Sequence, residues 1–339
     1  MNQIKKSRNL YIDIVKSFLI VSVVIGHTIV AFFPDEYIYN NIFKLAYSFH
    51  MFLFIFVSAY LVKLVGHEIN FLWLKKRFIR LMIPYIVWTA LLLVINNNFS
   101  LYNYFLLFIK PSFWFLIVLF LYDTTYYILN IITNKINKQI KIIVVYIFVI
   151  MFIWFISKNI IKNTEILHLY SIYLPEYFAG IFAFTFKEKI INVIKKYKYF
   201  ILLYPIFMSI YTFKDHSNFV DTMQIILSYL TTWSISNNTW NIVSVFYNHY
   251  LVAPLGMIFW GMILWKLYKL NILGKRFSLI GKYTLSIYLM SGFFNYYYIG
   301  FLEIDIVISV LMGIFIPIIF DFMIKKSPKI HYILFGSYK

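Results

Sequence analysis

The chain has 339 residues, of which 62% are hydrophobic and 22% aromatic. A soluble domain of this length does not carry so large an apolar fraction, and long apolar runs recur along the whole chain. The absence of cysteine excludes disulfides, thiolate nucleophiles and cysteine metal sites. The composition therefore predicts an all-α polytopic membrane protein, and the runs are too long for the short alternating strands of an outer-membrane barrel.

Ten apolar segments have about the length that a helix needs to cross a bilayer. They cover residues 10–32, 42–64, 79–96, 113–133, 141–157, 171–186, 199–213, 251–268, 279–300 and 305–324. The first segment is too long for the apolar part of a signal peptide, so we expect it to remain as the first span. No internal repeat is visible, and we expect a single membrane domain over residues 1–339.

The distribution of the basic residues predicts the topology. With a cytoplasmic N-terminus, the ten spans place all but five of the 31 Lys and Arg residues at the cytoplasmic side or at cytoplasmic helix ends. The five left outside are Lys44, Lys110, Lys158, Lys162 and Lys214. The net charge of +18 is therefore a topological signal, and we expect cytoplasmic termini and no nucleic-acid partner.

Residues 219–236 are apolar enough for one more span. Counting them would move four basic residues to the outer side: Lys266, Lys269, Lys275 and Arg276. We therefore expect an external or re-entrant helix within an outer loop at residues 214–250, placed over the outward mouth of the bundle.

A polar stripe interrupts the first apolar segment. Eleven residues separate Lys16 from His27, so a helix places both on one face, roughly 16 Å apart along its axis. Asp13 lies one turn before Lys16 and is placed to orient it through a charge-assisted hydrogen bond. Ionisable groups at membrane depth normally face a bundle interior or a water-filled cavity, so we expect the chemistry on this face.

Several segments together resemble the acyltransferase family 3 membrane proteins. Residues 13–16 followed by His27 are similar to the first-helix signature of that family. Similar segments follow in the expected order at residues 47–60, 77–85, 114–116 and 281–289, and residues 47–60 are most similar to the branch related to fucose 4-O-acetylases. The chain departs from the pattern at Lys16, where arginine is frequent, and at Ser291, where histidine is frequent.

The resemblance implies transfer of an acyl group, most simply acetyl from cytoplasmic acetyl-CoA, to a sugar hydroxyl. The acceptor would be a surface or capsular polysaccharide or its lipid-linked precursor, and the protein would lie in the bacterial plasma membrane. His27, assisted by Lys16 and Asp13, would carry the catalysis. Because histidine titrates near neutral pH, His27 suits a general base, and it suits a nucleophile equally well.

Other polar residues are candidates for binding the substrates. Arg77 and Arg80 lie three residues apart and would bind the donor's phosphates with Lys16, unless they serve only the positive-inside rule. The candidates for the substrate pocket are His50, Ser58, Trp114, Asp123 and Glu176. The two carboxylates alternatively pair with hydroxyl side chains. No metal-ligand spacing is present, so no metal is expected.

A second function class is a non-enzymatic transporter or flippase for a lipid-linked or acidic glycan. Lys16, Asp123 and Glu176 would then line the path of the substrate. Transporters often carry paired internal repeats with interrupted helices, and the sequence shows no such pairing, which favours the enzyme.

The predicted topology can be tested by cysteine labelling, because the chain has no native cysteine. We expect Ser217→Cys, in the predicted outer loop, to react with a membrane-impermeant thiol reagent added to intact cells. Ser7→Cys should react only after the membrane has been opened. Labelling of Ser217→Cys from the cytoplasmic side alone would contradict the ten-span topology.

Overall fold

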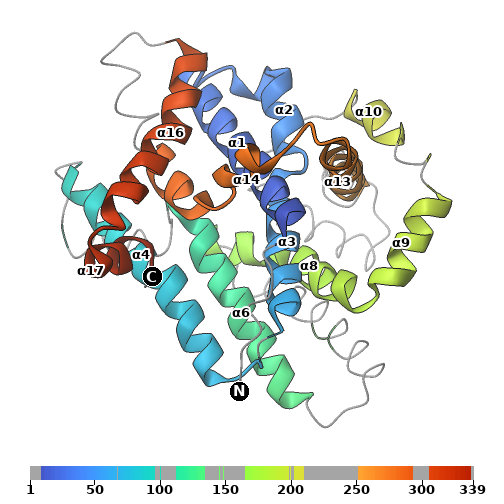
Figure 1. Ribbon diagram of the computed structural model, residues 1–339, viewed down its shortest axis with the longest axis horizontal. Helices are drawn as coiled ribbons and strands as arrows, with labels where there is room; N and C mark the ends of the chain where they lie inside the picture. The colour runs from blue at the N-terminus through green and yellow to red at the C-terminus, as the bar shows by residue number, and fades with distance from the viewer. Residues whose placement is uncertain are drawn as a thin grey trace, which may run out of the picture. The chain divides into compact units, whose positions relative to one another are not determined.

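The computed structural model describes helices joined by turns and loops, with no strand among its described residues (Figure 1). Those residues are 9–66, 68–95, 100, 112–133, 145, 148, 165–197, 199, 202–209, 251–292 and 305–336. The outer loop expected at residues 214–250, with its helix at 219–236, lies outside them. So does the span expected at 141–157, apart from two single residues.

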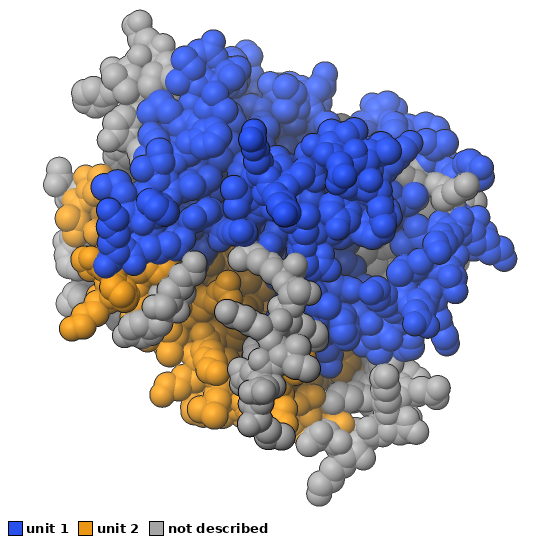
Figure 2. Space-filling view, in the orientation of Figure 1, with its two compact units in different colours: residues 1–65, 180–213, 246–326 blue, residues 66–179, 214–245, 327–339 orange. Residues whose placement is uncertain are grey.

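The chain divides into two compact units, which Figure 2 colours separately. Unit 1 consists of residues 1–65, 180–213 and 246–326. Its helices are α1 (Leu10–Phe32), η1 (Tyr37–Tyr39), α2 (Asn41–Tyr47), α3 (His50–Val65), α9 (Lys187–Lys196), α10 (Leu203–Met208), α13 (Ala253–Lys269), α14 (Lys275–Ile280) and α16 (Ile306–Ile324).

Unit 2 consists of residues 66–179, 214–245 and 327–339. Its helices are α4 (Phe71–Ile95), α6 (Trp114–Ile132), most of α8 (Glu165–Thr185) and α17 (Pro328–Phe335). Helix α4 packs against both α6 and α17, as Figure 1 shows. Trp88 of α4 donates a hydrogen bond from Nε1 to the carbonyl oxygen of Leu334 at 2.9 Å, which ties α17 to α4.

Five helical segments in the described part are long and apolar enough to cross a membrane. They are Leu10–Phe32, Asn41–Val65, Phe71–Ile95, Trp114–Ile132 and Ile306–Ile324. Each overlaps one of the predicted spans, and the first has the predicted bounds. The predicted spans at 171–186 and 251–268 overlap α8 and α13, which are helices but are not among these five.

Local capping explains where two of the spans begin. The side chain of Asn9 accepts hydrogen bonds from the backbone N–H groups of Tyr11 and Ile12, so α1 begins at Leu10. Asn70 accepts from the backbone N–H of Trp73 at 3.0 Å, so α4 begins at Phe71 rather than at the predicted residue 79. The basic run at residues 75–80 therefore lies inside a helix.

The second span is interrupted between α2 and α3, where Ser48 and Phe49 form a turn. The Ser48 hydroxyl donates its proton to the carbonyl oxygen of Leu45 at 2.8 Å and therefore accepts from the Tyr204 hydroxyl, also at 2.8 Å. His50 donates from Nδ1 to the carbonyl oxygen of Ala46 at 2.8 Å. Side chains thus supply hydrogen-bond partners to the carbonyl and hydroxyl groups at the interruption. Such groups need partners within the protein where water is excluded.

The predicted span at residues 279–300 is also divided. Helix α14 ends at Ile280, a turn follows, and the chain is helical again over residues 284–292. The turn is held by α1, because the backbone N–H of Gly281 donates to the Ser17 hydroxyl at 2.7 Å. In the predicted span at 199–213, the described residues 202–209 contain only the short helix α10.

The contact at Gly281 predicts a steric requirement for glycine. A Cβ atom there would lie 2.1 Å from the carbonyl oxygen of Asp13, whereas one at Gly274 would meet nothing within 4 Å. We expect Gly281→Ala to lower the free energy of unfolding by about 1–3 kcal/mol, the usual cost of overpacking. Gly274→Ala, the matched control, should melt like the unchanged protein. Thermal unfolding in detergent measures both, and equal melting temperatures would contradict the close packing of α1 on this turn.

Candidate functional site

The predicted polar stripe lies on one uninterrupted helix, because α1 runs without a break from Leu10 to Phe32. Lys16 and His27 therefore share a face, as the spacing requires. Helix α1 contacts α2, α3, α13, α14 and α16, so it lies at the centre of unit 1. A catalytic group on α1 would consequently be held by a helix at the centre of that unit.

The inner part of the stripe is an ion pair. The Nζ atom of Lys16 lies 3.8 Å from Oδ1 of Asp13, with Asp13 buried and Lys16 partly exposed. This distance exceeds that of a hydrogen bond, so the predicted orienting contact exists as an electrostatic pair. Ser17, the next residue, links α1 to α14 through the carbonyl oxygen of Phe277 at 2.7 Å. Asp13 and Lys16 are thus fixed at the end of α1 that packs on α14.

His27 differs from the other polar residues of α1. Its side chain is partly exposed, and it makes no hydrogen bond to any other described residue. The preceding residue, Gly26, lies directly under the ring of Tyr47, because a Cβ atom at Gly26 would be 2.2 Å from Tyr47 Cε2. Helix α2 therefore approaches α1 closely next to His27.

His50 belongs to the same unit and lies near this contact. Its ring is 4.5 Å from that of Tyr47, edge to face, and its side chain is buried. Because a carbonyl oxygen can only accept, the hydrogen bond to Ala46 places the proton on Nδ1 of His50. Tyr47 thus connects the surroundings of the two histidines, a role that the sequence analysis did not assign to it.

Ser58 is the remaining candidate in unit 1. Its hydroxyl donates to the carbonyl oxygen of Phe54, one turn earlier in α3, at 2.8 Å. This bond is typical of serine inside an apolar helix and occupies the hydroxyl proton. Ser58 keeps its acceptor lone pairs, so it remains a candidate only as an acceptor of a hydrogen bond.

Unit 2 contains a buried charge cluster at the junction of α4, α6 and α8. Arg77 donates from Nε to Oδ2 of Asp123 at 2.5 Å, and the Tyr177 hydroxyl donates to Oδ1 of Asp123 at 2.7 Å. Asp123 is completely buried, and among the described residues Arg77 balances its charge while Arg77 and Tyr177 donate hydrogen bonds to it. The pairing of Asp123 with a tyrosine hydroxyl was an expected alternative, whereas its pairing with Arg77 was not expected.

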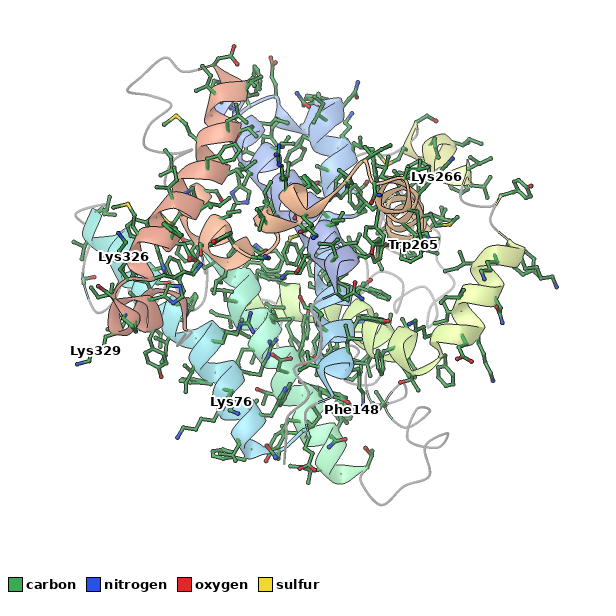
Figure 3. The ribbon with its side chains drawn as sticks, viewed as in Figure 1. Lys76, Phe148, Trp265, Lys266, Lys326 and Lys329 are labelled. Atoms are coloured by element: carbon green, nitrogen blue, oxygen red, sulfur yellow. The ribbon has the colours of Figure 1, made fainter. Side chains whose placement is uncertain are left out.

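The two arginines that the sequence presents as a pair have different surroundings. Arg77 lies mostly within the cluster, whereas the Arg80 side chain is exposed. Lys75 and Lys76, which precede Arg77, are exposed as well, and Figure 3 labels Lys76 on α4. The start of α4 therefore presents an exposed basic surface beside one buried guanidinium group.

Trp114 and Glu176 are the remaining candidates in unit 2. The Trp114 ring is stacked on that of Tyr173, with centroids 5.7 Å apart and planes 14° from parallel. Glu176, one turn after Tyr173 in α8, is buried, and its Oε2 atom has no hydrogen-bond partner among the described residues. An aromatic surface and a buried carboxylate that lacks a donor are features that a hydroxyl-rich ligand would satisfy.

Comparison with protein families gives one match over nearly the whole chain. The model of acyltransferase family 3, described as an acyltransferase domain, matches residues 9–324. Comparison with curated proteins and comparison with solved structures found no significant match.

The buried pair of Arg77 and Asp123 predicts strong energetic coupling. Arg77→Met or Asp123→Leu alone leaves one charge buried without its partner, so we expect each to destabilise the protein by about 3–5 kcal/mol. The double variant removes both charges and should be destabilised less than either single variant. Unfolding in a denaturing detergent measures all three, and strictly additive effects would show that the pair contributes nothing.

Proposed function

Because the chain belongs to acyltransferase family 3, we propose that it is a membrane-bound O-acyltransferase that moves an acetyl group from acetyl-CoA to a sugar hydroxyl. The match over residues 9–324 is the observation that carries acyl transfer. The similarity of residues 47–60 to the fucose 4-O-acetylase branch supports a surface or capsular polysaccharide, or its lipid-linked precursor, as the acceptor. We place the protein in the bacterial plasma membrane with both termini in the cytoplasm, as its charge distribution favours.

His27 is proposed as the catalytic residue. As a general base it would take the proton of the acceptor hydroxyl while that oxygen attacks the thioester carbonyl carbon. The carbon–sulfur bond then breaks, and the departing thiolate takes the proton from the imidazolium. As a nucleophile, His27 would first attack the thioester carbon, and the carbon–sulfur bond would break with the thiolate taking the imidazole proton. The sugar hydroxyl would then attack the acyl-imidazole, the acyl–nitrogen bond would break, and the hydroxyl proton would pass to the imidazole. The absence of a hydrogen-bond partner for His27 among the described residues supports either role.

The basic residues are proposed to hold the donor. Lys16 lies eleven residues before His27, at the end of α1 that the charge distribution favours as the cytoplasmic end. Paired with Asp13, it would contact a donor phosphate or the developing charge near the thioester. Arg77 would bind donor phosphates through its planar fork, and the exposed Arg80 would add attraction for the same anion.

The remaining candidates are proposed to contact the acceptor. Trp114 and Glu176 offer an aromatic face and a carboxylate to sugar hydroxyls, and His50 and Ser58 offer polar atoms in unit 1. Asp123 is less suited to contact an acceptor directly, because both of its oxygen atoms already accept hydrogen bonds from Arg77 and Tyr177.

Replacement of His27 tests the proposal. We expect His27→Ala to reduce acetyl transfer by at least about 10²–10⁴-fold while the protein still inserts and purifies normally. The assay is transfer of radiolabelled acetyl groups from acetyl-CoA to candidate glycans by the purified protein. His67→Ala, at a histidine without an assigned role, is the matched control.

The same assay separates the two roles of His27. Incubation with radiolabelled acetyl-CoA alone should label the protein at His27 if the residue is a nucleophile, and should leave it unlabelled if it is a base. Transfer at the wild-type rate by His27→Ala would remove His27 from the mechanism in both cases.

A further inference from the structure

The carboxylate of Asp123 is divided between two donors from two different helices. Its Oδ2 atom accepts from Nε of Arg77 on α4, and its Oδ1 atom accepts from the hydroxyl of Tyr177 on α8. Arginine and aspartate commonly form a two-pronged pair, in which both oxygens of the carboxylate meet adjacent N–H groups of the guanidinium. Here Tyr177 takes the oxygen that would form the second prong.

The consequence appears on the guanidinium group. Nη2 lies beside the Nε–H bond and would supply the second prong of such a pair. It is buried, and it has no hydrogen-bond partner in the part of the chain that the structure describes. Neither Nη atom of Arg77 is paired within that part, since its only recorded hydrogen bond is through Nε. A buried donor without an acceptor costs free energy, so a ligand that accepts hydrogen bonds from this edge would supply what the described residues do not.

We propose that Asp123 and Tyr177 are positioning residues that hold Arg77 by Nε, so that its two Nη atoms receive the oxygens of a diphosphate. The diphosphate is that of the acyl-CoA donor, and this assignment rests on the function proposed above. Two parallel N–H donors match two oxygen atoms of a phosphate. The charge of Arg77 is already balanced by Asp123, and the exposed Lys75, Lys76 and Arg80 of the same helix supply additional attraction for the anion.

The structural alternative is that the cluster only holds α4, α6 and α8 together. Tyr177→Phe separates the two interpretations, because it removes a neutral hydroxyl and leaves both charges in place. Without the tyrosine proton, Oδ1 of Asp123 is released and can form the second prong with Nη2 of Arg77. The variant should therefore close the Nη edge to the anion although Arg77 itself is unchanged. A purely structural cluster would lose one hydrogen bond and keep its affinity for anions.

Isothermal calorimetry on the purified full-length protein tests the proposal, with coenzyme A and inorganic pyrophosphate as separate probes. We expect Tyr177→Phe to weaken the binding of both probes by roughly tenfold or more, the loss expected for a charge-assisted hydrogen bond. Tyr170→Phe is the matched control, since Tyr170 also lies on α8 but its hydroxyl bonds to Thr125 at 2.6 Å. It should bind both probes like the unchanged protein.

Arg77→Lys provides a second test if Tyr177→Phe does not fold. Lysine keeps the charge beside Asp123 but has no Nη atoms, so both probes should again bind roughly tenfold or more weakly. Wild-type affinity in either folded variant, or an unchanged protein that binds neither probe, would overturn the proposal. A different result is that the unchanged protein transfers no acetyl group while the variants still lose pyrophosphate binding. That result would overturn the proposed function and leave the diphosphate site in place.

Discussion

The cost of placing charge among apolar side chains is the constraint on which the arrangement of unit 2 depends. An isolated ionised side chain at membrane depth costs roughly 2.5–3.5 kcal/mol even on the mildest scales, so Asp123 needs partners from its own protein. Arg77 and Tyr177 provide them from α4 and α8, and the single carboxylate on α6 thereby fixes three helices relative to one another. The same contacts set the direction in which the guanidinium group of Arg77 faces.

In unit 1, the comparable constraint acts on backbone groups. Turns that interrupt apolar helices free N–H and carbonyl groups, which need partners where water is excluded. Ser17 on α1 receives the N–H of Gly281, and the Ser48 hydroxyl donates to the carbonyl oxygen of Leu45 at the interruption of the second span. These bonds stabilise two interruptions in segments that pack on α1, which itself runs without a break from Leu10 to Phe32.

The sequence predicts those features that depend on local pattern. Apolar length predicts α1 and four other spans, and the period of the helix places Lys16 and His27 on one face. It does not predict the turn at residues 281–283, because Ser17 is 264 residues away in the chain. The contacts of Asp123 with Arg77 and Tyr177 likewise join residues 46 and 54 positions apart, and no local periodicity reports such a pairing. The sequence contains one sign that Asp123 has a partner, which is its position inside an apolar segment.

The pairing of Asp123 also bears on the choice between an enzyme and a transporter. A carboxylate that carries a coupling ion or proton must be able to exchange its partner during the cycle, and such groups line a path through the membrane. Asp123 instead accepts hydrogen bonds at both oxygen atoms and is completely buried beside a permanently charged arginine. Removing Arg77 from it would leave two unbalanced buried charges, which is costly. The arrangement therefore suits a fixed structural group better than an exchangeable one, which favours the enzyme over the transporter.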